Sequence, residues 1–207
     1  MTDMEAFREA VAAWAAGGAD EAGERARALA VGQGVRTVVL LEGPSDLAAV
    51  DALAAGRGRD LAAEGVCVLP MGGAMSIRRF ARILGPAGLG LRLTGLCDER
   101  ERPYYARGLA EHGGAAAFFV CTADLEDELI RALGVGRVEQ LVEEQGDLRS
   151  LQTFQRQPAQ QGRTPEQQVR RFLGTKKGRK IQYGRVLTGA LPPDRTPAPL
   201  RELLDSL

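Results

Sequence analysis

Acidic residues follow short apolar segments at three places in this sequence. Glu42 comes directly after the first such segment, Asp98 directly after a later one, and Asp124 and Glu126 shortly after the last. Converging carboxylates repel one another and raise one another's pKa unless a cation neutralises them. Ligand sets made only of oxygen atoms suit hard ions such as Mg²⁺ and Mn²⁺. The acids therefore predict a divalent-metal site, although each one alone is also typical of a helix N-terminus.

The segments that deliver these acids have the pattern of buried parallel strands. They are short, rich in Val and Leu, and alternate with stretches of helical spacing at 45–55, 76–84 and 103–111. This alternation predicts an α/β fold with a parallel sheet of four strands and helices on both faces. Ligands of such sheets bind beyond the carboxyl ends of the strands. The predicted strands are 37–41, 66–70, 91–97 and 115–121.

Four short motifs at the ends of these strands carry a resemblance to a known family. They are Glu-Gly-Pro-Ser-Asp at 42–46, Met-Gly-Gly at 71–73, Leu-Cys-Asp at 96–98 and Asp-Leu-Glu at 124–126. In this order they resemble the Toprim domain, which topoisomerases, primases and nucleases share. The form of the motifs is most similar to the overcoming-lysogenization-defect (OLD) family of nucleases. The resemblance covers roughly residues 35 to 130 and implies a Toprim, Rossmann-like fold.

The resemblance also implies a set of ligands for Mg²⁺ or Mn²⁺. In that family the ions are bound by the Glu after the first strand, the acids of an Asp-x-Asp motif and a Glu of a later Asp-x-Glu segment. This sequence departs from the family because its Asp-x-Asp motif is Asp98-Glu99-Arg100. Glu99 or Glu101 must therefore replace the second acid, or one ion site is weak or absent. The implied ligands are Glu42, Asp46, Asp98, Glu101, Asp124 and Glu126.

Three further residues near the strand ends have a structural and a functional interpretation. Asp46 could simply cap the helix after the first strand, which is common for an Asp at a helix start. Gly72 and Gly73 could let backbone N–H groups approach a phosphate, or could form an ordinary turn. The only histidine, His112, has no accompanying GxSxG motif, so no Ser-His-Asp triad is expected.

The last part of the chain is basic. Residues 151–207 hold 11 Arg and Lys against 4 Asp and Glu, whereas the whole chain of 207 residues has no net charge. Between 170 and 185 basic residues occur without an acid, which is typical of a surface for nucleic-acid phosphates and also of a solvated basic face. The predicted nucleic-acid contacts are Arg170, Arg171, Lys176, Lys177, Arg179, Lys180 and Arg185.

The remaining composition limits the class of protein. The chain has three cysteines without CxxC spacing, no targeting segment, and no apolar run of about 18 residues. We therefore expect a cytoplasmic protein without membrane contact. OLD proteins also carry an ATPase domain, but this sequence has no GxxxxGK[ST] segment. An ATPase is therefore expected only as a separate partner.

These features predict three regions and one favoured function. The regions are N-terminal helices at 1–34, a Toprim domain at 35–133 and a C-terminal helical, basic region at 134–207. The favoured function is metal-dependent nuclease activity on DNA. Two alternatives stay open, namely a non-catalytic Toprim module that binds nucleic acid beside a separate ATPase, and nucleotidyl transfer of the primase kind.

The catalytic residues expected for a nuclease are acids that bind the ion and a lysine that offsets charge in the transition state. They are Glu42 and Asp98, with a lysine from the set Lys176, Lys177 and Lys180.

Overall fold

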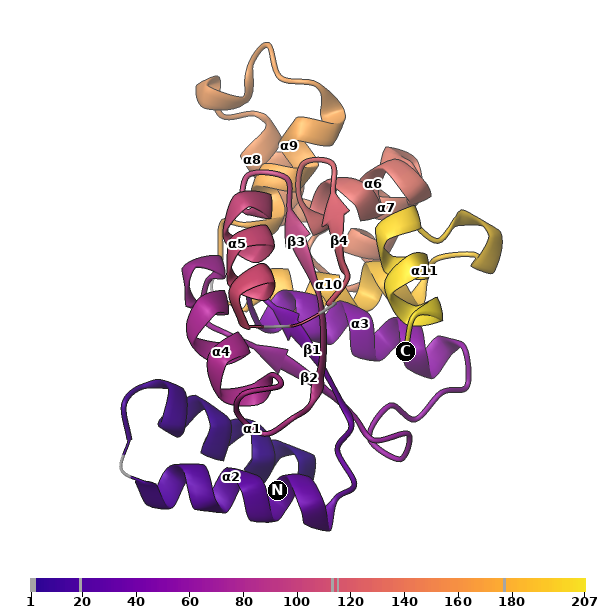
Figure 1. The fold of residues 1–207 in the computed structure, drawn as a ribbon. Coiled ribbons are helices and arrows are strands. Elements are labelled where there is room, and N and C mark those ends of the chain that lie inside the picture. The colour runs from indigo at the N-terminus through magenta and orange to yellow at the C-terminus, as the bar shows by residue number, and fades with distance from the viewer. Residues whose placement is uncertain (1–2, 19, 113, 115, 177) are drawn as a thin grey trace.

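The chain folds around a parallel sheet with the strand order β2-β1-β3-β4 (Figure 1). The structure is a computed structural model that describes residues 3–18, 20–112, 114, 116–176 and 178–207. It has the predicted α/β fold with a four-stranded sheet. The strands are β1 (Thr37–Leu41), β2 (Val66–Pro70), β3 (Arg92–Asp98) and β4 (Phe118–Cys121).

The direction of strand addition reverses at β1. On one side β1 pairs with β2, so that Thr37 lies opposite Val66, and on the other side it pairs with β3, so that Thr37 lies opposite Arg92. At such a switch point a crevice opens beyond the carboxyl ends of the two strands. Glu42 follows β1 and Asp98 ends β3, so both acids lie at this crevice.

Helices cover both faces of the sheet (Figure 1). Helices α1, α2, α4 and α5 pack on one face, and α3 with the helices from α6 onward packs on the other. None of the helices in the described part of the chain has the length and apolar character needed to cross a membrane. The helices are α1 (Asp3–Ala15), α2 (Asp20–Gly32), α3 (Pro44–Gly56), α4 (Ile77–Leu84), α5 (Arg102–His112), α6 (Leu125–Leu133), α7 (Val135–Glu144), α8 (Leu148–Gln155), α9 (Pro165–Leu173), α10 (Arg179–Gly189) and α11 (Ala198–Asp205), with short 3₁₀ turns η1 (Ala74–Ser76), η2 (Pro158–Gln160) and η3 (Pro193–Arg195).

Strand β1 contributes to two hydrophobic cores. Val38 and Leu40 are buried in the core beneath α1, α2, α4 and α5, and Val39 and Leu41 are buried in the core on the opposite face. Successive side chains of a strand point to opposite faces of the sheet. A strand covered on both faces therefore needs an unbroken apolar sequence, which is the pattern that identified β1.

Helix α10 packs closely along α3. A Cβ atom at Gly184 of α10 would lie 2.7 Å from the backbone oxygen of Ser45 in α3, so only glycine permits this approach. Tyr183 and Leu187 on either side of Gly184 are fully buried in the same core as α3. The C-terminal helices thus share a core with the sheet region, and the middle of α10 lies beside the first turn of α3.

Most predicted elements lie where the sequence indicated, with two differences. Strand β3 runs one residue later than expected and has Asp98 as its last residue. Strand β4 begins at Phe118, whereas the prediction began at residue 115, which lies outside the described residues.

Candidate metal site and basic surface

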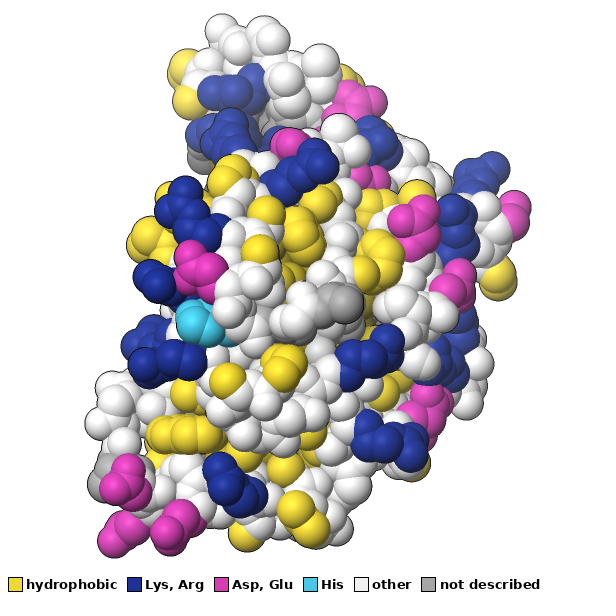
Figure 2. Space-filling view, viewed as in Figure 1, with side chains coloured by type: hydrophobic (Ala, Val, Ile, Leu, Met, Phe, Trp, Pro, Cys, Tyr) yellow, Lys and Arg dark blue, Asp and Glu magenta, His cyan; other side chains and the backbone are white. Residues whose placement is uncertain are grey.

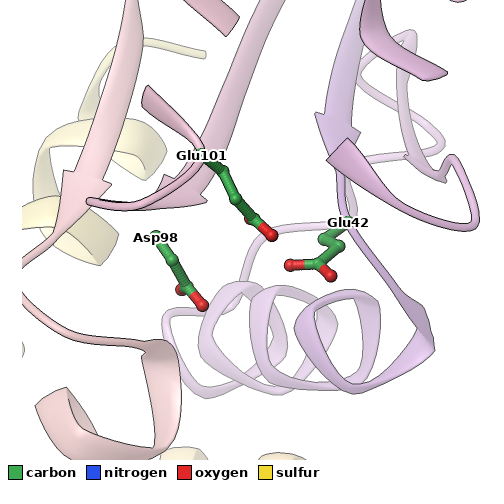
Figure 3. Close-up of side chains that lie close together, drawn as sticks. All are labelled: Glu42, Asp98 and Glu101. Carbon is green, nitrogen blue, oxygen red and sulfur yellow. The ribbon is translucent and has the colours of Figure 1, made fainter. Parts of the chain in front are cut away.

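Three carboxylates converge at the carboxyl edge of the sheet. Glu42 follows β1, Asp98 ends β3, and Glu101 belongs to the turn before α5. One ligand oxygen from each side chain lies within 4.8 Å of the others, and Figure 3 shows the three carboxylates directed into a common space. We call Glu42, Asp98 and Glu101 the acid trio. Its spacing suits a shared ion, because Mg²⁺ lies about 2.1 Å from each ligand oxygen.

A tight turn after β3 brings Glu101 into the trio. The backbone N–H of Glu101 donates to the carbonyl oxygen of Asp98 (2.9 Å), and that of Glu99 donates to the carbonyl oxygen of Cys121 at the end of β4 (3.1 Å). The Glu99 side chain is exposed and pairs with Arg102 (3.5 Å). Of the two candidate replacements for the second acid of Asp-x-Asp, Glu101 therefore joins the cluster in the described structure and Glu99 does not.

The electrostatics of the trio favour a bound cation. Burial, followed by the negative charge of neighbouring carboxylates, raises the pKa of Asp98 to about 7. Burial and the adjacent Glu42 carboxyl raise the pKa of Glu101 to about 8. Among the described residues, Oε2 of Glu101 is buried without a hydrogen-bond partner. Crowded carboxylates and a buried oxygen without a partner are costly until a cation compensates them, so these residues fit a divalent ion.

Asp46 adds negative charge near the trio and also lies at the start of α3. The N-cap residue of α3 is Gly43, and Asp46 lies in the first turn, where its Oδ2 accepts the backbone N–H of Gly43 (2.8 Å). Burial raises the pKa of Asp46 to about 7 despite this hydrogen bond, and the charges of Glu126 and Glu42 contribute to the shift. Asp46 therefore lies close enough to interact with the site, although it is not one of the three converging ligands.

The acids after β4 are paired with cations from the C-terminal helices. Oδ1 of Asp124 accepts the backbone N–H of Asp127 (2.8 Å) and caps α6, while its Oδ2 accepts from Nε of Arg170 (2.8 Å). Glu126 is only 6% exposed, and its carboxylate lies 3.1 Å from Nζ of Lys180. Both predicted ligands are thus held by basic side chains of α9 and α10.

Comparisons with known proteins agree with this architecture. Residues 35–99 match the family described as the Toprim domain of overcoming lysogenization defect protein-like proteins. The predicted resemblance to the OLD-like Toprim domain is confirmed.

Solved structures of two OLD proteins share the fold over most of this chain. The C-terminal region of the Burkholderia pseudomallei OLD protein is 21% identical with a TM-score of 0.60, over 83% of this chain and 96% of that one. The C-terminal region of the Xanthomonas campestris pv. campestris OLD protein is 23% identical with a TM-score of 0.63, over 83% of this chain and 93% of that one. A search of curated proteins found no match. The structural likeness extends beyond the OLD-like Toprim segment into the C-terminal helices.

The basic residues beyond the Toprim segment have different surroundings. Lys180 forms an ion pair with Glu126, one of the acids after β4. Lys176 is exposed and in no ion pair within the described ranges. Lys177 lies outside the described residues. Arg179 is 7% exposed, stacks over the Phe172 ring at 4.0 Å, and so is engaged inside the protein.

Arg171 and Arg185 are exposed on α9 and α10. On the face shown in Figure 2, Lys and Arg side chains are distributed over the whole surface.

The glycine loop after β2 braces the end of β1. Gly72 and Gly73 have φ angles of 73° and 125°, which favour glycine. The backbone N–H of Gly73 donates to the carbonyl oxygen of Glu42 (3.0 Å). This N–H is therefore already used within the protein, and the loop supports the backbone that presents the Glu42 side chain.

Sequence reasoning missed two residues beside the Toprim segment. Phe154 and Arg163 line a pocket with Arg170 and Lys180. Arg163 comes before residues 170–185, the basic stretch without an acid that predicted the nucleic-acid contacts. Phe154 is a single aromatic residue in a helical pattern, which is typical of a core residue. Only the packing of α8 and α9 against α10 brings these residues together.

Proposed function

We propose that the protein is a metal-dependent nuclease that hydrolyses phosphodiester bonds of DNA. The observation that carries the proposal is the acid trio at the sheet edge, with the ammonium group of Lys180 held nearby by Glu126. Carboxylates that bind ions and a cation that stabilises charge on phosphate oxygens are groups that phosphodiester hydrolysis uses. The similarity to OLD Toprim domains supports the same class of reaction.

The proposed cofactor is Mg²⁺ or Mn²⁺. Glu42, Asp98 and Glu101 would hold it, since both ions prefer carboxylate oxygens. Asp46 lies in electrostatic range of the trio and is a candidate for completing a second ion site. When bound, the ion polarises the scissile phosphate and lowers the pKa of an attacking water molecule.

Lys180 would stabilise the charge that develops on the phosphate oxygens. The ion pair with Glu126, a buried carboxylate, holds the end of this long side chain at the edge of the site. An ammonium group has three N–H donors, so one carboxylate leaves donors available for a phosphate. Glu126 would thus act as a positioning residue for Lys180.

DNA is the proposed substrate because exposed cations lie in the same C-terminal segment as Lys180. Arg171 and Lys176 are exposed, and no ion pair involves them in the part of the chain that the structure describes. Arg185 is exposed as well, and its charge acts on Asp51 of α3. Cations without acidic partners release counterions when they contact a phosphate backbone, which is the main source of sequence-independent affinity.

A non-catalytic module that binds nucleic acid beside a separate ATPase is the second candidate. Arg100 in place of the second Asp supports it, because this change removes one acid from the motif. The position of Glu101 in the trio favours the nuclease instead. Cleavage by the purified protein in the absence of any ATPase distinguishes the two candidates.

The nuclease proposal is tested by nicking of supercoiled plasmid in Mn²⁺, with melting temperature measured in parallel. Wild type should nick the plasmid, whereas Glu42→Gln and Glu101→Gln should lose activity and also the thermal stabilisation by Mn²⁺. That stabilisation should be about 2.7 kcal/mol at a hundredfold excess of the ion over its Kd. Glu99→Gln, an exposed acid of the same turn, is the control and should behave as wild type. Full activity of Glu42→Gln would refute the proposal.

A further inference from the structure

A pocket opens between α8, α9 and the start of α10, next to the acids that follow β4. Its volume is about 560 Å³, which lies within the usual range of about 300–1,000 Å³ for small-molecule sites. It is therefore large enough for a single nucleotide. The lining residues that matter here are Asp124, Phe154, Arg163, Arg170, Arg171 and Lys180.

The lining of the pocket is strongly positive. Among the described residues, its lining holds four cationic side chains and one acid, Asp124. Arg170 is paired with Asp124, and Nε of Arg163 donates to a backbone carbonyl, that of Ala159 (3.0 Å). Arg171 is exposed without an ion pair in the described ranges. Guanidinium groups bind phosphates through paired N–H donors. The pocket therefore suits a phosphate group.

An aromatic ring lies among these cations. Phe154 is half-buried and lines the pocket, and its ring packs against the Phe172 ring with 5.8 Å between centroids. Because Phe172 is buried in the core, it supports the Phe154 ring from behind. Aromatic rings that interrupt a basic surface stack on nucleobases, at about 1–3 kcal/mol per base.

Two lining residues connect the pocket with the acid trio. Lys180 lines the pocket and also pairs with Glu126. Asp124 lines the pocket and follows β4, in which Cys121 lies opposite Asp98 of β3. The pocket and the trio are therefore adjacent parts of one surface.

From this geometry we infer that the pocket binds one unpaired nucleotide of a DNA strand, next to the phosphate held at the acid trio. Arg163 and Arg171 would contact its phosphate, and its base would stack on Phe154. A base that enters the pocket has to leave its partner strand, so the preferred substrate is single-stranded DNA or a frayed end. This inference rests on the proposed nuclease function, because that function places a phosphate of the same strand at the acid trio. Its test measures binding alone and needs no cleavage.

The test is binding of fluorescent oligothymidine of 12 nucleotides to the full chain in EDTA, compared with a duplex of 12 base pairs. Arg171→Gln should weaken oligothymidine binding about fivefold to tenfold and flatten the salt dependence of log Kd by about 0.7. Arg195→Gln is the control, because Arg195 is equally exposed in η3 and does not line the pocket. It should change affinity less than about twofold.

Phe154→Leu tests the stacking step, since it keeps an apolar side chain against Phe172. It should weaken oligothymidine binding about tenfold and leave duplex binding within about twofold. Equal losses in Arg171→Gln and Arg195→Gln, or equal affinity of wild type for the two DNAs, would overturn the inference. So would displacement of the DNA by polyglutamate at equal charge concentration, which would identify an acidic protein segment as the ligand. Intact binding without nicking would refute only the nuclease proposal.

Discussion

Replacing Asp46 by Asn should stabilise the metal-free protein at high pH. The Asn side chain keeps an oxygen acceptor for the backbone N–H of Gly43, which now donates to Oδ2 of Asp46 (2.8 Å), but it cannot ionise. Burial raises the pKa of Asp46 from 3.8 to about 7. The folded protein therefore has to hold a charge at pH 8 that the unfolded chain exposes to water.

The size and sign of the effect follow from this pKa. At about 1.4 kcal/mol per pH unit, the difference between 3.8 and about 7 corresponds to a ceiling of about 4 kcal/mol. Because the folded pKa is the higher one, wild type loses stability as pH rises from 4 to 7, and the loss is complete above 7. Asp46→Asn lacks this loss. Its free energy of unfolding should exceed that of wild type by about 2–4 kcal/mol at pH 8 and match it near pH 4.

Urea unfolding in EDTA at several pH values between 4 and 8 measures this difference. Asp194→Asn is the control, because Asp194 is exposed and in no ion pair within the described ranges. Saturating Mn²⁺ should reduce the advantage of Asp46→Asn, since a bound cation relieves the same charge. If Asp46→Asn were no more stable than wild type in EDTA at pH 8, the carboxylate would not be desolvated and the reasoning would fail.

Two further predictions concern α10. Lys180→Met should slow Mn²⁺-dependent cleavage at saturating DNA about a hundredfold or more and lower the free energy of unfolding by about 1–3 kcal/mol, because buried Glu126 loses its partner. Lys176→Met should weaken DNA binding without changing the saturated rate, and stopped-assay kinetics separate these outcomes. Gly184→Ala should lower the free energy of unfolding by about 1 kcal/mol. The added methyl group crowds the backbone of Ser45, which costs about 1–3 kcal/mol, whereas the higher helix propensity of alanine stabilises the protein by about 1 kcal/mol. Gly189→Ala on the same helix meets nothing within 4 Å and should not destabilise in thermal melts.

The sheet and two members of the trio could be predicted because their signals are local. Strands β1 and β2 are apolar runs that are almost wholly buried, and Glu42 and Asp98 come directly at strand ends, where parallel strands present them to one edge. The sequence does not distinguish Glu101 from Glu99 as the replacement for the second acid of Asp-x-Asp, because both are next to position 100. Only the hydrogen bonds of the turn decide that Glu101 faces the trio and Glu99 faces solvent.

The C-terminal part of the site could not be predicted because it depends on long-range packing. Arg179 and Lys180 are adjacent basic residues, and the charge pattern of the sequence predicts the same role for both. Their positions on α10 direct Arg179 into the protein over Phe172 and Lys180 toward Glu126. Which cation meets which acid depends on the close contact of α10 with α3, and no neighbouring sequence encodes that contact.

The docking of α10 on α3 has a consequence for biosynthesis. A nascent chain that has emerged through α6 already contains the strands and every acid of the site, but not Lys180, which belongs to the later helix α10. Until α10 arrives, the face of α3 that it covers is also exposed to solvent. Under the proposed function, a chain that ends at α6 holds the acids of the site but lacks the lysine that cleavage would use. The chain gains its complete catalytic surface only when its two halves have come together.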